Sequence, residues 1–287
     1  MFPRAAVTKM RISIVTPSFR QVDYLKRCAA SVADQAGSFA YEHLIQDGMS
    51  GEAFEEWARR QNFADVVSEA DDGMYDAINR GFGRAKGEIL AWLNCDEQYL
   101  PGALAAVDQW FSDHPECDVL FGDVVLVSAA GDPISYRQAV VPWLGHTRNC
   151  FLASYSAATF VRRRVIQEGF HLSTEYRMIS DAVWICGLLE RGYRCGVLNR
   201  PLATFTQTGE NMGQQAAGFA EGARWRRRDG WWRKLRSAGW SAAHRARKML
   251  NGSYRSRDVE IEVYLGDDGR RSTKRGRISG RWQNGSK

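Results

Sequence analysis

Carboxylates follow three of the strands that the sequence predicts. Asp47 follows one strand, Asp72 follows the next, and Asp96 with Glu97 follows a strongly apolar third. Because the carboxyl ends of parallel strands meet at one edge of a sheet, we expect these acids to lie close together. Their mutual repulsion is costly unless a cation or a set of hydrogen-bond donors joins them. A hard cation such as Mg²⁺ or Mn²⁺ that also binds substrate phosphates would meet this cost, so the pattern indicates a site for a divalent metal and a phosphorylated ligand.

The elements that would position these acids alternate between strand and helix. β-branched or apolar runs that end at polar residues predict strands at 11–16, 41–46, 64–68 and 89–93. Helical spacing, such as that of Met74, Ile78 and Phe82, predicts a helix in each gap between them. This alternation specifies an α/β fold, an α/β/α sandwich with a mostly parallel central sheet.

The second half of the chain is less regular. Patterns there predict helices at 101–111 and 179–191, strands at 119–127, 151–161 and 193–198, and a polar loop at 206–215. The part of that loop from Thr206 to Met212 is a candidate for closing over bound substrates.

The composition changes near Gly222. Residues 222–257 are rich in Arg, Lys and Trp, and a helical wheel predicts a basic amphipathic helix. Its apolar side would collect Trp231, Trp232, Leu235, Ala242, Ala243, Ala246, Met249 and Leu250, with Arg233, Lys234, His244, Arg245 and Lys248 facing away. An anionic membrane surface is the favoured partner for this segment, and packing on the enzyme is the alternative. Residues 258–287 are rich in Gly, Ser, Arg and Lys, which predicts a flexible tail.

Bulk properties exclude several classes of protein. The formal charge of +6 on 287 residues suits an anionic ligand, but no motif supports nucleic-acid binding, and none is expected. The six cysteines have neither a disulfide-framework pattern nor zinc spacing. No apolar run is long enough for a signal peptide or a membrane span. We therefore expect a cytoplasmic protein, with peripheral contact at the inner face of the plasma membrane as a candidate.

Three motifs in order carry a resemblance to a known family. VTPSFR, IQDGMS and SEADDGMYDAINRGFGRAKGEILAWLNCDEQYLPGAL resemble glycosyltransferase family 2, the inverting enzymes of GT-A fold that build bacterial surface polysaccharides. The resemblance covers residues 11–210. It implies a GT-A-like domain at 1–221, with a nucleotide-sugar-binding half at 10–100 and an acceptor half at 101–221. The implied donor is a UDP- or GDP-sugar, and the implied acceptor is a saccharide or a lipid-linked saccharide.

The resemblance also implies roles for individual residues. Thr16, Pro17 and Asp47 match the positions that hold the nucleotide base and ribose, and Asp72 belongs to the same side of the pocket. The D-x-D-like motif matches Asn94-Cys95-Asp96-Glu97, with Asp96 as the leading contact of metal and diphosphate and Glu97 beside it as a second metal ligand. Relatives commonly read Asn-Ser-Asp-Asp here, so Glu97 extends its carboxylate by one methylene.

Further contacts follow from position and charge. Lys86, with Arg84, is a candidate for neutralising phosphate, although such residues are more often surface charges. Asn79, like Asp76, is a candidate pocket residue or a solvent-facing helix residue.

An inverting transfer needs a general base for the acceptor hydroxyl. The family places this base on an acid at the start of a helix in the second half, which here is Asp181. An N-terminal helix cap would explain an acid there too.

Two alternative functions compete with that of a glycosyltransferase. A nicotinamide-dependent dehydrogenase would need G-x-G-x-x-G directly after the first strand, where TPSFR stands instead. Glu97 and the lack of a second Asp in the motif keep open a catalytically degenerate protein that binds nucleotide-sugar or membrane as an assembly partner.

Overall fold

The computed structural model describes residues 10–209, 216–226, 233–266 and 269–280. The first half alternates strand and helix as expected from the sequence. Its elements are β1 (Met10–Ser18), α1 (Val22–Ala33), β2 (Ala40–Asp47), α2 (Glu52–Ala58), β3 (Ala64–Ser68), α3 (Met74–Arg84) and β4 (Ile89–Trp92).

The second half mixes short strands and helices. It comprises β5 (Glu97–Tyr99), α4 (Ala103–Asp113), β6 (Val119–Ser128), β7 (Pro133–Arg137), α5 (Leu144–Asn149), η1 (Ser156–Ala158), β8 (Thr159–Arg162), α6 (Arg163–Gln167), α7 (Ser180–Glu190) and β9 (Cys195–Gln207). The strand predicted at 151–161 is therefore only β8 preceded by a single 3₁₀ turn. The polar loop predicted from Thr206 begins as the last residues of β9, and residues 210–215 lie outside the described residues.

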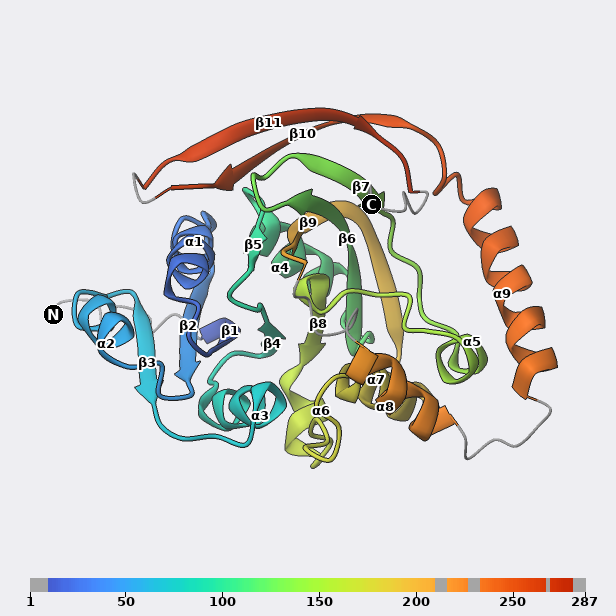
Figure 1. Cartoon of the computed structure of the whole chain (residues 1–287), viewed down its shortest axis with the longest axis horizontal. Coiled ribbons are helices and arrows are strands. Elements are labelled where there is room, and N and C mark those ends of the chain that lie inside the picture. Colours follow the sequence, from blue (N-terminus) through green and yellow to red (C-terminus); the bar gives the residue numbers. More distant parts are fainter. Residues whose placement is uncertain (1–9, 210–215, 227–232, 267–268, 281–287) are drawn as a thin grey trace, which may run out of the picture.

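In the described part of the chain, one central sheet runs in the order β3-β2-β1-β4-β8-β6-β9-β5, with β7 paired to β6 (Figure 1). β1, β2, β3 and β4 are parallel, as the sequence predicts for the first half. The second half is mixed, because β8 runs antiparallel to both β4 and β6. The sheet is thus parallel where the four candidate strand ends meet and mixed beyond β4.

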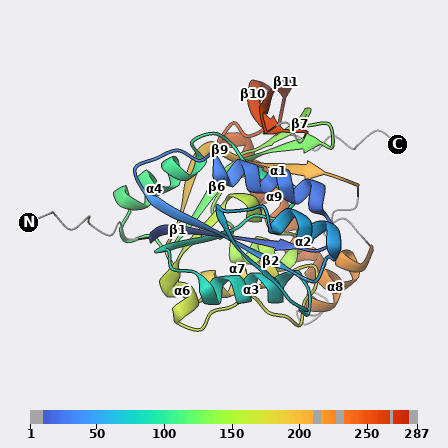
Figure 2. The ribbon, with the colours of Figure 1, turned by 90° about the vertical axis from the view of Figure 1, so that its left-hand side faces the viewer.

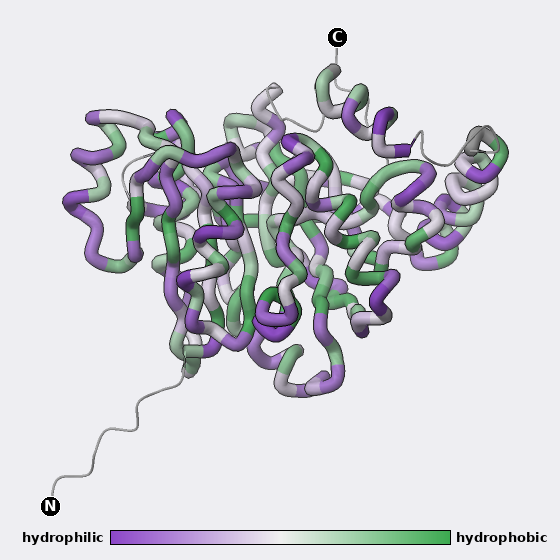
Figure 3. The backbone as a smooth tube through the Cα atoms, turned by 90° about the horizontal axis from the view of Figure 1, so that it is seen from below, coloured by the Kyte–Doolittle hydropathy of each residue, from purple (hydrophilic) through white to green (hydrophobic). Residues whose placement is uncertain are grey.

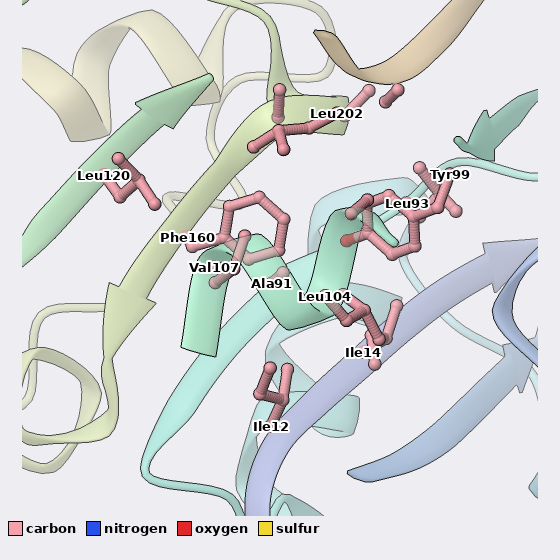
Figure 4. Packing of buried hydrophobic residues seen from close by; sticks show 14 of the residues in the cluster. Ile12, Ile14, Ala91, Leu93, Tyr99, Leu104, Val107, Leu120, Phe160 and Leu202 are labelled. Carbon is pink, nitrogen blue, oxygen red and sulfur yellow. The ribbon is translucent and has the colours of Figure 1, made fainter. Parts of the chain in front are cut away.

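Helices cover both faces of this sheet (Figures 1 and 2). On one face Ile12 and Ile14 of β1 pack with Val32 of α1 and with α4 (Figure 4). On the other face Val15 and Trp92 pack with α3 and α7. Side chains of β1 alternate between the two cores, as the twofold period of a strand requires. Apolar stretches run through the interior of the molecule, and polar residues mark the outer turns (Figure 3).

The expectation of a flexible tail is wrong for residues 258–266 and 269–278. β10 (Arg257–Tyr264) and β11 (Arg271–Ile278) form an antiparallel hairpin over β7 (Figure 1). Val259, Ile261 and Val263 alternate along β10 and bury their side chains against β6 and β7. Arg271 binds both carboxylate oxygens of Asp34, the residue after α1, at 2.6 and 2.8 Å. The exposed residues between the apolar side chains of β10 are mostly charged, so the composition of the segment as a whole predicts flexibility.

The C-terminal helices are α8 (Ala216–Arg226) and α9 (Arg233–Leu250). His244 and Lys248 of α9, predicted to lie opposite the apolar side, are buried. Leu235 and Leu250, on the predicted apolar side, are 66% and 88% exposed. Of the predicted apolar residues, Trp231 and Trp232 lie outside the described residues. Among the described residues, no helix is long and apolar enough to cross a membrane.

The close packing of α3 on β1 gives a stability prediction. A Cβ at Gly81 would lie 2.4 Å from Cγ1 of Val15, whereas a Cβ at Gly83 on the same helix would meet nothing within 4 Å. We expect Gly81→Ala to lower the free energy of unfolding by about 1–3 kcal/mol through overpacking. The control Gly83→Ala should leave stability unchanged or raise it by up to ~1 kcal/mol. Urea denaturation measures both, and equal stabilities would contradict the packing described.

Candidate active site

The candidate site lies where the parallel strands end. Backbone hydrogen bonds continue from one strand end to the next, from Gly48 N to Ser18 O and from Glu69 N to Asp47 O, each at 2.9 Å. On the other side of β1, Leu93 N donates to Val15 O at 2.9 Å. The loops after these strands therefore leave the sheet side by side, and their polar residues gather at this edge.

Asp47 stands at the centre of the loop network. Its buried carboxylate accepts hydrogen bonds from Ser50 N at 2.9 Å and from Ser68 Oγ at 2.7 Å, and the Ser50 hydroxyl donates to it as well. These bonds join the loop after β2 to the end of β3. Contact between Asp47 and a nucleotide stays a prediction, and in this geometry the carboxylate first orders the pocket wall.

The acid after β3 that faces this wall is Asp71 instead of Asp72. Asp71 accepts a hydrogen bond from Gly73 N at 2.9 Å, and its carboxylate packs beside Gly48. Burial raises the pKa of Asp71. Asp72 is exposed, and its amide donates to Asp76 Oδ2 at 3.1 Å. The sequence offered a signal for Asp71, because an aspartate two residues before a glycine commonly closes a turn with its side chain.

Thr16 and Pro17 are buried at the end of β1. Thr16 Oγ1 lies 2.8 Å from His43 Nε2 and 3.7 Å from Cys28 Sγ, so its side chain belongs to the interior. Burial lowers the pKa of His43 to about 3, which keeps the imidazole neutral. A nucleotide contact from Thr16 would therefore have to come from the backbone.

Two predicted pocket residues do not fit the site. Lys86 is exposed, and its amide donates to Glu42 Oε1 at 2.6 Å near the opposite end of the sheet. That end lies about 16 Å from Ser18 along β1, at ~3.3 Å per residue. Arg84 precedes it at the C-terminus of α3, which runs back from the site. Residues just before a parallel strand lie at its amino end, whereas the candidate site lies at the carboxyl ends of the strands.

Asn79 also has a different role. Its Nδ2 donates to Leu172 O at 2.8 Å, and its Oδ1 accepts from Leu172 N at 3.1 Å. The paired bonds occupy the amide and tie α3 to the segment before α7. Asn79 thus joins the two halves of the molecule instead of lining the donor pocket.

The loop from Asn94 to Glu97 connects β4 to β5. Glu97 is fully buried, and its Oε2 accepts a hydrogen bond from Asn94 N at 2.8 Å. Cys95 is also buried and donates to Gln21 Oε1 at 2.9 Å, whereas Asp96 is partly exposed. Glu97 therefore supports the loop from inside and Asp96 presents the carboxylate. A metal-ligand role for Glu97 stays a prediction. The full burial of its side chain does not favour this role.

Burial disfavours negative charge on the carboxylates of this loop. Burial raises the pKa of both Asp96 and Glu97, and the charge of Asp96 raises that of Glu97 further. Asn94 Oδ1 and Glu97 Oε1 are buried with no hydrogen-bond partner among the described residues. Each such oxygen costs free energy until a donor or cation meets it.

No group of three or more His, Cys, Asp or Glu side chains within the described residues could hold a metal alone. Mg²⁺ and Mn²⁺ sites that share substrate phosphates need only one or two protein carboxylates. The partly exposed Asp96 and the unpartnered oxygen of Asn94 fit such a shared site.

Asp181 approaches from the other half of the molecule. It lies in the first turn of α7, where its Oδ1 accepts from Ala182 N at 2.8 Å and from the Tyr75 hydroxyl at 3.4 Å. Burial raises the pKa of Asp181. The charge of Asp181 in turn raises the pKa of Glu97, which places the two acids in one electrostatic environment. A site shared by Asp181 and Asp96 stays a prediction, and the bond to Ala182 also serves the N-terminus of α7.

Glu221 of α8 is a residue that the sequence did not single out. Its carboxylate accepts the three consecutive amides of Arg177, Met178 and Ile179 at 2.9, 2.7 and 3.1 Å. These amides belong to the segment that leads into α7. Glu221 therefore fixes the loop that delivers Asp181, a role for which the sequence gives no local signal.

Known proteins share parts of this sequence. An uncharacterized glycosyltransferase of Mycobacterium tuberculosis is 34% identical over 90 residues, which are 31% of this chain and 34% of that protein. A PGL/p-HBAD biosynthesis glycosyltransferase of Mycobacterium bovis is 32% identical over 123 residues, 40% of this chain and 47% of that protein. The matches thus span about a third to a half of these relatives.

Solved structures share the fold over most of the chain. TarS 1–349 of S. aureus in complex with UDP has a TM-score of 0.54 at 12% identity and covers 91% of this chain and 98% of its own. The mannosyltransferase PcManGT of Pyrobaculum calidifontis, in complex with GDP-Man and Mn²⁺, has a TM-score of 0.53 at 14% identity, covering 84% and 76%. The fold is therefore the GT-A-like α/β fold that the sequence predicts.

The family model described as glycosyl transferase family 2 matches residues 13–177, more than half of the 287 residues. This span includes the strand ends, the acid-bearing loops and the segment that leads into α7. The chain belongs to glycosyltransferase family 2.

Proposed function

We propose that the chain transfers a sugar, with inversion at its anomeric carbon, from a nucleotide-sugar to a saccharide or a lipid-linked saccharide. The observation that carries this proposal is the packing of the two halves that bear Asp96 and Asp181. Trp92 of β4 packs on Trp184 of α7 with ring centroids 5.8 Å apart, and the charge of Asp181 raises the pKa of Glu97, which follows Asp96. One acid suits the diphosphate side of a donor, and the other suits the hydroxyl of an acceptor.

The neighbours support a nucleotide-sugar as the donor. Structures of the same fold contain UDP-GlcNAc in TarS and GDP-Man with Mn²⁺ in PcManGT. We propose that the donor of this chain is a UDP- or GDP-sugar that binds across the ends of β1, β2 and β3. In this arrangement Asp47 and Asp71 shape the wall beside the nucleoside.

The proposed reaction is a single displacement. Asp181 accepts the proton of the acceptor hydroxyl, and that oxygen forms a bond to the anomeric carbon while the bond from this carbon to the diphosphate oxygen breaks. The nucleoside diphosphate leaves with the electron pair of the broken bond. Asp96, with Asn94, would hold a divalent cation, which when bound neutralises charge on the diphosphate. Tyr75 and Glu221 hold Asp181 in place.

A binding experiment tests the donor side of the proposal. We expect UDP- or GDP-sugars with Mn²⁺ to raise the melting temperature, since a ligand at ~100 times its dissociation constant stabilises by about 2.7 kcal/mol. Asp96→Asn should lose this stabilisation, because it removes the charge that meets the cation. Asp72→Asn is the matched control and should keep it. No shift with any UDP-, GDP- or dTDP-sugar would favour a degenerate protein over an enzyme.

The acceptor side is tested by the pH dependence of transfer. Burial raises the pKa of Asp181, and a base acts only when deprotonated. We therefore expect kcat/KM to fall as the pH drops through this raised pKa and to recover above it. Asp181→Asn should lower kcat by about 10²–10⁴ and leave donor binding intact. A variant with wild-type kcat would show that Asp181 only caps α7.

The support of Asp181 by Glu221 gives a separate prediction. Glu221→Gln replaces a charged acceptor of three amides by a neutral one, so the segment before α7 should be held less firmly. We expect kcat to fall about tenfold, as a small displacement of a base allows, with little change in donor affinity. The control Glu56→Gln alters an exposed acid on α2. Equal loss in both variants, or a loss of donor affinity alone, would contradict this role.

A further inference from the structure

Helix α9 lies at the edge of the molecule next to α5 (Figure 1), and large apolar side chains along it are exposed. Leu235, Met249 and Leu250 are 66%, 69% and 88% exposed. Between them Ala242 and Ala246 are exposed too, so the row continues along the helix. Large exposed apolar side chains on one face of a helix mark a surface that something else covers.

Packing of the opposite face fixes this orientation. Trp240 rests on the backbone of Gly145 in α5, where a Cβ would lie 2.1 Å from the indole. The ring of His244 stacks on that of His146 at 4.2 Å. Ser241 Oγ lies 3.3 Å from Cys150 Sγ. Rotating the helix to bury its leucines would break all of these contacts.

Positive charge borders the apolar row. Helical spacing places Arg236 and Arg245 on its two margins, and both are exposed. The sequence has no acidic residue from position 230 to 257. At the end of α9 a surface depression of about 450 Å³ is lined by Arg245, Met249, Gly252, Tyr254 and Arg255. The depression offers two guanidinium groups beside apolar side chains.

We propose that this face of α9 docks on an anionic phospholipid surface. Leu235, Met249 and Leu250 enter the boundary of the acyl chains, and Arg245 and Arg255 contact lipid phosphates. An apolar row with basic margins is the arrangement that lies in a membrane interface. A second copy of the chain fits less well, because a twofold contact would bring arginines against arginines.

Docking would bring the enzyme to the surface where lipid-linked acceptors reside. The inference deepens the proposed function by naming the surface on which it works. It is tested without donor or acceptor, so its failure is distinct from a failure of the transfer proposal.

Co-sedimentation with vesicles tests the docking face. We expect the full chain to sediment with vesicles of phosphatidylcholine and phosphatidylglycerol, and at least about tenfold less with phosphatidylcholine alone. The double variant Met249→Glu, Leu250→Glu should reduce binding to the anionic vesicles by at least about tenfold, because it places charge in the apolar row. Arg245→Glu with Arg255→Glu should do so too. Both pairs are exposed, and circular dichroism checks that the variants fold.

Matched controls place the effect on α9. Phe63→Glu changes a side chain that is 41% exposed just before β3, and Arg60→Glu reverses an exposed charge in the turn after α2. Neither should change vesicle binding. Equal binding to neutral and anionic vesicles, or unchanged binding by both α9 variants, would overturn the proposal. If the chain instead forms a dimer without lipid, and the Met249→Glu, Leu250→Glu variant is monomeric, the proposal is overturned in favour of a second copy.

Discussion

The site depends on carboxylates that are held at the edge of a sheet with little water around them. Asp96, Glu97 and Asp181 all have pKa values raised by burial, and each is sensed by its neighbours. A protein keeps such groups together only if a ligand, a cation or a proton offsets the repulsion. The parallel half of the sheet creates this demand by ending its strands at one edge. A cationic partner and a phosphorylated donor would satisfy it in the bound state.

The mixed second half supplies what the parallel half lacks. In this half α7 packs against β4. Three hydrogen-bonded links then hold Asp181 in position. Tyr75 donates to Asp181, the amide of Asn79 joins α3 to Leu172, and Glu221 accepts the amides of the segment before α7. The position of the proposed base thus depends on groups from α3, α7 and α8, which are far apart in sequence. A strand end alone could hold a nucleotide, but these links add the second carboxylate that a transfer requires.

Local patterns predicted the fold of the first half well, because each strand and helix there carries its own periodicity. Asp96 was singled out by its place after an apolar strand and Asp181 by resemblance, and the roles of both stay predictions. Lys86 and Asn79 were misplaced because their roles depend on which sheet edge, or which distant backbone, they meet. The hairpin was missed because the polar composition of residues 258–287 predicted a flexible tail. The alternation of Val259, Ile261 and Val263 in β10 was nevertheless present in the sequence. The wheel of α9 could not show which of its sides meets the protein, because Trp240 anchors it to α5 through a tertiary contact.

The central claim is that one displacement occurs between a donor held near Asp96 and an acceptor deprotonated by Asp181. The stereochemistry of the product tests it most directly. With an α-linked nucleotide-sugar identified by binding, the anomeric coupling in the proton NMR spectrum of the first-formed product reports the new linkage. The account predicts a β-linkage, since the acceptor attacks the face opposite the leaving diphosphate. An α-linkage would mean retention and would contradict the assignment of Asp181 as the base of a single displacement.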